Sequence, residues 1–229
     1  MENTSNDVPI RDAASLVLLR FAPNGTQVLM GQRGSKAAFM ASKFVFPGGA
    51  VDKEDLAIGQ LAPIRNARLQ LAYETTPELV DALPIAGIRE LWEETGLRVG
   101  CGAAPQVAPA GWDDFFADGT TPDPDALHYF FRAITPPGRP RRFDARFFVT
   151  SAEAVVDNVE DFSRASGELS KLQWIDLDAA RKLPLPFVTE LVLAEVAEMG
   201  HAFDKPRPVP FFKHGASGGA FTSIMPESP

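Results

Sequence analysis

The sequence is poor in cysteine and in basic residues, and it has no long hydrophobic run. Cys101 is the one cysteine among 229 residues, which excludes intrachain disulfides and any zinc site built from several cysteines. Lysine and arginine number 22 against 30 acidic residues, a net charge of −8. This balance argues against nucleic-acid binding, which uses a basic surface. It is compatible with a phosphorylated substrate, because a metal ion can reverse the local field.

No uncharged apolar run approaches the ~20 residues that span a bilayer, so we expect no membrane partner. Residues 1–7 (MENTSND) are polar and acidic, unlike the basic and then apolar stretch of a signal peptide. We therefore expect a soluble, cytoplasmic protein. The length favours one large domain that buries roughly 70% of its unfolded surface without a disulfide or metal.

The hydrophobic pattern predicts an α/β sandwich, with mixed strands and a central helix. Residues 14–21 are nearly continuously apolar, as in a strand covered on both faces, and Asn24-Gly25 favours a tight turn into the next strand. Pro84 suits the first turn of a helix that ends at Gly96. We expect strands over 14–21, 27–33, 44–46, 97–99, 128–134, 143–150 and 169–175, helices over 63–72, 77–83, 84–95, 176–182 and 187–199, and loops over 34–43 and 100–126.

The most informative segment is 89–97, Arg-Glu-Leu-Trp-Glu-Glu-Thr-Gly-Leu. At about 100° per residue, Glu90, Glu93 and Glu94 share roughly a 100° sector of a helix. Three carboxylates there repel one another and lie near the negative end of the helix dipole, which costs about 0.3–1 kcal/mol each. A divalent cation would remove this penalty, and oxygen ligands suit Mg²⁺ or Mn²⁺. The alternative is a solvated acidic helix face.

At these residues the sequence resembles the Nudix hydrolases, whose signature is G-x5-E-x7-R-E-U-x-E-E-x-G-U, with U a bulky aliphatic residue. The second half matches at every fixed position from Arg89 to Leu97. In the first half Gly49 is followed after five residues by Asp55, and 33 residues rather than seven separate Asp55 from Arg89. This split signature is similar to that of the long-insert branch, which includes the peroxisomal coenzyme A diphosphatases.

The resemblance implies a single Nudix domain over 1–229, with a core at about 12–200, an insert at 56–83 and a Pro/Gly-rich C-terminal arm at 204–229. It implies an α/β/α sandwich with a mixed central sheet and a loop-helix-loop catalytic motif. The arm is either a disordered end or a clasp on a second subunit, which would make a homodimer.

The resemblance also implies a metal-dependent hydrolase of a diphosphate linkage. Glu90, Glu93 and Glu94 would ligate Mg²⁺ or Mn²⁺ with the carbonyl of Gly48, and Arg89 would orient a neighbouring glutamate. A metal-activated water would attack phosphorus, and Glu93 or Glu168 would accept its proton. These implied catalytic residues are Glu93, Glu90 and Arg89.

The implied substrate is a small nucleoside diphosphate derivative, with coenzyme A or acyl-coenzyme A as the first candidate. Arg33 and Phe46 stand at the separation found in the upstream motif of the coenzyme A diphosphatases, although Gly34, Ala38 and Ser42 depart from it. Arg33 is either a phosphate ligand or a solvent-facing residue at a strand end. Arg141, Arg142 and Arg146 either bind substrate phosphate or pair with the protein's own carboxylates, and Arg142 is the candidate ligand among them.

Other hypotheses about the substrate and the function stay open. ADP-ribose, a dinucleotide or a nucleotide sugar would suit the same chemistry. A non-catalytic Nudix-fold binding module is a further alternative, against which the complete set of three glutamates speaks.

Overall fold

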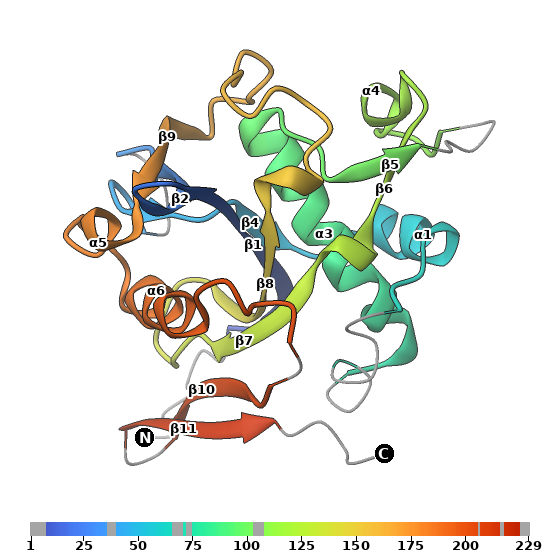
Figure 1. Cartoon of the computed structure of the whole chain (residues 1–229). Helices are drawn as coiled ribbons and strands as arrows, with labels where there is room; N and C mark the ends of the chain where they lie inside the picture. The colour runs from blue at the N-terminus through green and yellow to red at the C-terminus, as the bar shows by residue number, and fades with distance from the viewer. Residues whose placement is uncertain are drawn as a thin grey trace.

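The computed structural model describes residues 8–35, 40–65, 71, 75–102, 108–205, 207–215 and 218–224. Nine strands in these ranges form one mixed sheet of order β11-β10-β7-β8-β1-β2-β3, in which β4 also pairs with β1 and β9 with β2 (Figure 1). The strands are β1 (Ile10–Ala22), β2 (Gly25–Arg33), β3 (Phe44–Val45), β4 (Gly48–Ala50), β7 (His128–Ile134), β8 (Arg142–Ser151), β9 (Leu169–Asp176), β10 (Val209–Gly215) and β11 (Gly218–Ile224). A separate pair joins β5 (Gly100–Gly102) to β6 (Thr120–Pro122).

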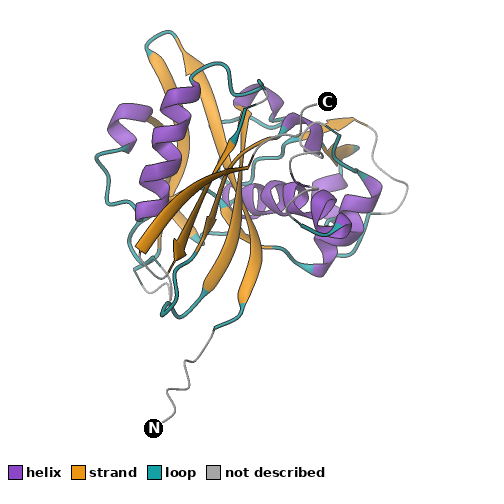
Figure 2. Ribbon diagram, turned by 90° about the horizontal axis from the view of Figure 1, so that it is seen from below, coloured by secondary structure: helices purple, strands orange, loops and turns teal. Residues whose placement is uncertain are grey.

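Helices lie against both faces of the sheet, so the predicted α/β sandwich is confirmed (Figure 2). The helices are α1 (Lys53–Leu61), α3 (Pro77–Thr95), α4 (Asp113–Phe116), α5 (Leu177–Ala180) and α6 (Phe187–Met199), with 3-10 turns η1 (Pro124–Ala126) and η2 (Ala152–Ala154). Within the described part of the chain, no helix has the length and apolar character needed to cross a membrane.

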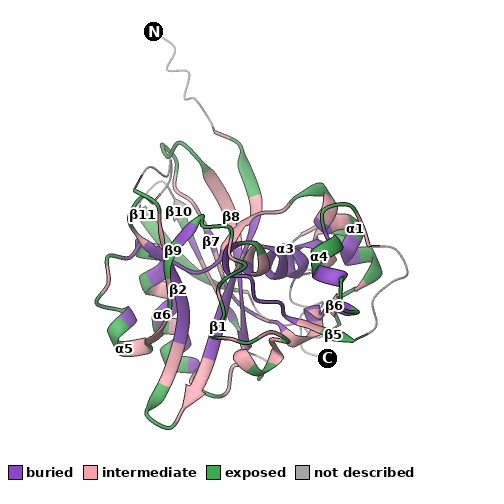
Figure 3. Cartoon of the chain, turned by 90° about the horizontal axis from the view of Figure 1, so that it is seen from above, coloured by how far each residue is buried: buried purple, intermediate pink, exposed green. Residues whose placement is uncertain are grey.

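Strand β1 shows why both faces are covered. Side chains alternate along a strand, so Ala14, Leu16 and Leu18 pack with α3 on one face, while Val17 and Leu19 pack with α6 on the other. All five are fully or almost fully buried. Figure 3 shows burial concentrated on α3 and the central strands. The nearly continuous apolar run of β1 thus reflects two cores that share one sheet.

The helical part of the structure differs from the sequence prediction in several places. Residues 77–95 form one helix, α3, rather than two, with Pro84 inside it. Proline in a helix interior loses one hydrogen bond and costs about 3 kcal/mol, but Leu83, Pro84 and Ile85 are all buried, and this packing offsets the loss. Helix α1 was not expected; a capping box between Asp52 and Asp55 starts it.

The predicted helix over 63–72 is not seen at 63–65, and its remaining residues other than 71 lie outside the described ones. The strand expected at 97–99 is represented by a single bridge between Val99 and Val155, followed by β5. The segment 100–126, expected as a loop, carries β5, α4, β6 and η1.

The C-terminal arm forms a hairpin of β10 and β11 that extends the sheet. Phe211 and Phe212 of β10 pair in parallel with Arg132 and Ala133 of β7. The pairing joins residues about 80 positions apart, which a local pattern cannot reveal. Residues 206, 216–217 and 225–229 of the arm lie outside the described ones.

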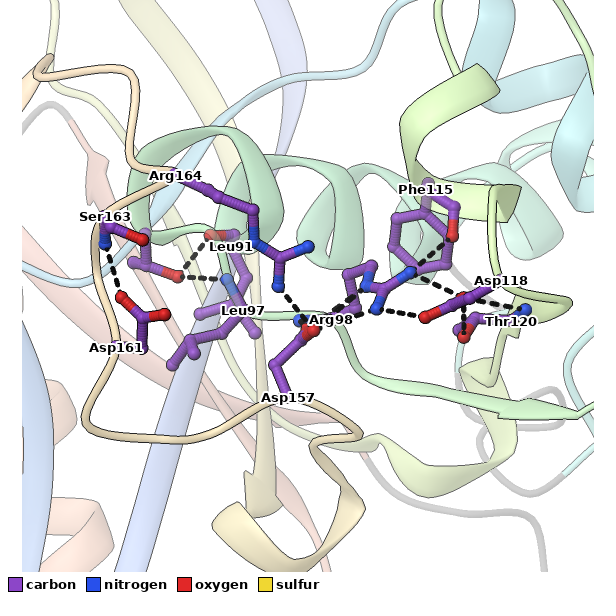
Figure 4. A network of polar contacts seen from close by, with 11 residues as sticks. Leu91, Leu97, Arg98, Phe115, Asp118, Thr120, Asp157, Asp161, Ser163 and Arg164 are labelled. Carbon is purple, nitrogen blue, oxygen red and sulfur yellow. Dashed lines mark hydrogen bonds and ion pairs between the residues drawn. The ribbon is translucent and has the colours of Figure 1, made fainter.

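Arg98, directly after α3, ties three segments together (Figure 4). Its guanidinium donates to Asp157 at 2.8 Å, to Asp118 at 2.8 Å and to the carbonyl of Phe115 at 2.9 Å. Arg164 also hydrogen-bonds to Asp157. Burial alone would raise the pKa of Asp157, but these bonds from Arg98 and Arg164 lower it below the usual range. The network fixes the loop over 156–168 against the end of α3.

We predict that Arg98→Ala lowers the free energy of unfolding by about 3 kcal/mol, because it leaves the carboxylate of Asp157 buried with fewer partners. The matched control is Arg65→Ala, which removes an exposed ion pair with Asp125 and should change stability by less than about 0.5 kcal/mol. Urea unfolding at neutral pH measures both. Equal stability of the two variants would contradict a structural role for Arg98.

Candidate active site

The three glutamates of α3 lie near the short strand β4, and two of them, Glu90 and Glu94, face it. They lie in the last two turns of the helix, which ends at Gly96 as the sequence predicts. Gly96 adopts φ +81°, a left-handed conformation that favours glycine, and its N–H donates to the carbonyl of Trp92 at 2.7 Å. Glu94 is 2% exposed, whereas the side chain of Glu93 is 46% exposed. The face is therefore only partly open to solvent.

The glycines of β4 allow a close approach to this face. The N–H of Gly48 donates to Glu94 Oε2 at 3.0 Å. A Cβ at Gly49 would lie 2.2 Å from Glu90 Oε1, and one at Gly48 would lie 2.3 Å from Ser15 Oγ. Neither position can carry a side chain without displacing a neighbour.

The register of β4 also orients the carbonyl of Gly48. Pro47 and Val51 make the hydrogen bonds to β1, at Leu16 and Asp12. In an antiparallel ladder these positions alternate, so the N–H and carbonyl of Gly48 point away from β1. The N–H is the group that meets Glu94, and the carbonyl is directed to the same side.

Arg89 links the glutamates of α3 to helix α1 and strand β4. Its guanidinium binds both oxygens of Asp55, at 2.9 and 3.1 Å. It also donates to Glu90 at 2.9 Å, to Glu93 at 3.0 Å and to the carbonyl of Ala50 at 2.9 Å. Asp55 is fully buried, so burial raises its pKa while the bonds from Arg89 oppose that shift. Asp55 thus holds Arg89, and the expected bonds from Arg89 to neighbouring glutamates are present.

The surroundings of Glu90 and Glu94 disfavour the ionised form of both carboxyl groups. Burial raises the pKa of Glu90 to about 7, although Arg89 acts in the other direction. Burial and the neighbouring Glu90 raise the pKa of Glu94 to about 8, opposed by the Gly48 N–H and by Arg33. The nearby negative charge of Glu168 also raises the pKa of both carboxyl groups. The site would be stabilised by additional positive charge.

Arg33 and Glu168 lie at the edge of this group. Arg33 ends β2 and pairs with Leu169 at the start of β9, which brings its guanidinium to 2.8 Å from Glu168. Both charges act on Glu94. The side chain of Glu168 is 59% exposed, so it is accessible to a ligand. Their proximity arises from the pairing of strands far apart in sequence.

The structure places the other two predicted substrate residues elsewhere. Phe46 is 4% exposed and packs in the core layer on the α6 face. Arg142 lies opposite Ile10 on β1, five residues along the strand from Ser15, which faces Gly48. At ~3.3 Å per residue this separation is about 16 Å. Arg142 donates to the carbonyl of Thr135.

Arg146 follows the structural alternative considered for this arginine cluster. It is 1% exposed and its guanidinium lies 2.5 Å from Asp12 and 3.4 Å from Asp144. Arg146 therefore pairs with the protein's own carboxylates.

The donor set fits a hard divalent cation. Carboxylate oxygens and a peptide carbonyl are the ligands that Mg²⁺ and Mn²⁺ prefer. Among the residues that the structure describes, no three His, Cys, Asp or Glu side chains converge closely enough to hold a metal ion. Glu93 is turned toward Arg89, while Glu90 and Glu94 lie against the glycine pair of β4.

Comparison with known proteins gives a consistent result. No family model matches the chain. It is 30% identical over 178 residues to "Putative nudix hydrolase 7" of Caenorhabditis elegans, an alignment that covers 72% of this chain and 51% of that protein, so the chain spans about half the length of this relative.

One solved structure points to the same fold, and a second matches more weakly. A NUDIX hydrolase from Alicyclobacillus acidocaldarius is 27% identical, with a TM-score of 0.65, over 85% of this chain and 95% of that one. The Nudix hydrolase RenU of M. smegmatis is 18% identical, with a TM-score of 0.42, over 82% and 85%. With the α3 residues, the C. elegans relative and the A. acidocaldarius structure show that the chain has the Nudix fold, and they support its membership of the Nudix hydrolase family.

Proposed function

We propose that this protein is a metal-dependent pyrophosphohydrolase that cleaves the diphosphate linkage of a nucleoside diphosphate derivative. The observation that carries the proposal is the pair Glu90 and Glu94, buried against the glycines of β4 with their pKa values raised to about 7 and about 8. Ionised carboxylates in such surroundings are costly for folding, and a cation would offset that cost.

Different residues of the site would have different roles in this reaction. Glu90, Glu94 and the carbonyl of Gly48 would hold Mg²⁺ or Mn²⁺, joined by Glu93 once it turns from Arg89. When bound, the cation supplies charge neutralisation at the phosphate oxygens and an acidified water. Arg89 keeps Glu90 in place through its bond at 2.9 Å.

Two carboxylates could accept the proton of the attacking water. Glu93 is half exposed and hydrogen-bonded to Arg89, and Glu168 is exposed and bonded to Arg33. Both can reach a solvent molecule at the open side of the site. Single substitution of each by glutamine distinguishes them, since loss of the proton acceptor lowers kcat more than it changes KM.

We propose coenzyme A or acyl-coenzyme A as the substrate, cleaved into 3′,5′-ADP and a 4′-phosphopantetheine portion. This proposal is supported by the long-insert resemblance and by Arg33, whose charge acts on Glu94. An arginine beside the carboxylates suits the 3′-phosphate, a group that ADP-ribose and NADH lack.

The first test removes one charge from the carboxylate face. We expect Glu94→Gln to lower the rate of diphosphate hydrolysis roughly 10³-fold, about 4 kcal/mol of transition-state stabilisation, while the fold is kept because a buried charge is removed. Glu190→Gln on the exposed face of α6 is the matched control and should keep full activity. A turnover assay with Mg²⁺ and Mn²⁺ measures both. Activity of Glu94→Gln within tenfold of wild type would refute the metal site.

The second test uses pH. A carboxyl whose pKa is raised by folding contributes stability below its unfolded pKa and loses it as pH rises through the folded value. The metal-free protein should therefore lose stability progressively as the pH rises from about 4.5, the ordinary pKa of these carboxyls, to about 8, the pKa of Glu94 in the folded protein. Because Mg²⁺ binds the ionised form, we expect it to raise the melting temperature more at the higher pH.

Thermal unfolding with and without Mg²⁺ at the two pH values measures this difference, and Glu94→Gln should reduce it. An increment from Mg²⁺ that is independent of pH would show that these two carboxyls do not bind the cation.

The third test addresses the substrate. We expect Arg33→Ala to lower kcat/KM for coenzyme A roughly 10–150-fold, the loss of one charge-assisted contact worth about 1.5–3 kcal/mol, and to leave 3′-dephospho-coenzyme A nearly unchanged. Arg142→Ala is the matched control, since Arg142 lies about 16 Å along the strand from the site, and it should affect neither substrate.

Equal losses on both substrates would mean that Arg33 contacts the diphosphate or supports Glu168. Turnover of ADP-ribose, a dinucleotide or a nucleotide sugar without any cleavage of coenzyme A would move the assignment to that compound. No turnover of any of them would favour a non-catalytic binding module.

A further inference from the structure

In the part of the chain that the structure describes, the C-terminal hairpin forms an outer edge of the main sheet. Strand β11 lies at the end of the strand order and, among the described residues, pairs only with β10. Six of its seven residues are exposed. Its outer N–H and carbonyl groups are therefore available to another strand.

This edge has none of the features that usually prevent pairing between sheets. Strand β11 reads Gly-Gly-Ala-Phe-Thr-Ser-Ile, with no charged residue and no proline, in a chain of which 23% is charged. Its partner β10 contributes Lys213 and no acid. Edge strands in soluble proteins are commonly protected by charge, proline or bulges.

An exposed aromatic patch adjoins the edge. Phe221 of β11 is 56% exposed and Phe187, at the start of α6, is 58% exposed. Both rings pack on Phe212, at 4.9 and 5.6 Å between centroids. Phe212 belongs to the core layer on the α6 face, so the patch lies on that face of the sheet.

We propose that β11 is a self-association edge, at which two copies of this chain pair antiparallel about a twofold axis at Phe221. Phe221 is the central residue of the strand, with three residues on each side, so this register pairs all seven positions. It sets Phe221 directly opposite Phe221 of the second copy and brings the two exposed patches together.

Charge does not oppose a second copy at this edge. Two chains of net charge −8 repel each other over most of their surface. Because β11 carries no charged residue, no two acidic side chains face each other when two copies of the strand pair. An isologous contact of this kind also closes after two copies and leaves no further free edge at β11.

Association would leave the candidate active site accessible. The sheet order places five strand spacings between β11 and β4, through β10, β7, β8 and β1, or about 24 Å. Phe221 lies on the α6 face, whereas the glutamates lie on the α3 face. The proposal is therefore independent of the hydrolase activity, and variants of β11 should keep it.

The test is sedimentation velocity of the full chain over a range of concentrations. We expect a dimer that dissociates on dilution, with a Kd of about micromolar order, because one strand pair and a small aromatic patch fall below the standard interface size. Phe221→Glu and Phe221→Lys should each be monomeric, since like charges would face each other across the axis. An equimolar mixture of the two should dimerise. Leu61→Glu, at an equally exposed residue of α1, is the matched control and should dimerise as the wild type does.

A second pair of variants tests the register without touching the aromatic packing. In the proposed pairing Ala220 of one copy lies opposite Thr222 of the other. Thr222→Lys should weaken the dimer about tenfold, and adding Ala220→Glu should restore it. A wild type that stays monomeric at all concentrations, or a Phe221→Glu variant that dimerises as the wild type does, would overturn the proposal. Failure of Ala220→Glu to restore the Thr222→Lys dimer would overturn the register.

Discussion

Arg89 holds the candidate site together, because its N–H donors reach three separate elements at once. It binds Asp55 in α1, the carbonyl of Ala50 in β4, and two glutamates of α3. A planar guanidinium with five donors can do this, whereas a lysine ammonium has three donors and no fixed fork. The relative positions of the acidic helix face and the glycine strand therefore depend on one side chain.

The features of the site that could be predicted from sequence are those with a local cause. The carboxylate face follows from the spacing of Glu90, Glu93 and Glu94 along one helix, and the end of that helix follows from Gly96. The two-sided burial of β1 follows from its unbroken apolar run. Each signal lies within a few residues, where the geometry of helix and strand fixes what is adjacent.

The rest depends on contacts between distant segments. Arg33 meets Glu168 because β2 pairs with β9, and β10 joins the sheet through β7. Pro84 suggested a helix start, but burial of its neighbours kept the helix continuous. Asp52 and Asp55 form a capping box, a pattern that can be recognised in the sequence and that would have predicted the start of α1. Phe46 and Arg142 were candidate substrate ligands, yet Phe46 packs in the core on the α6 face and Arg142 lies opposite Ile10, five residues along β1 from Ser15.

The length of the insert between the two halves of the signature can be related to its free-energy cost. Asp55 and Arg89 remain in contact although 33 residues separate them where seven would suffice. Closing the longer segment costs only about 1.4 kcal/mol more in chain entropy, since this cost grows with the logarithm of length. Each charge-assisted bond between the two side chains contributes about 1.5–3 kcal/mol. A motif that is continuous in space can therefore be discontinuous in sequence, and its intervening length is only weakly constrained by the stability of the site.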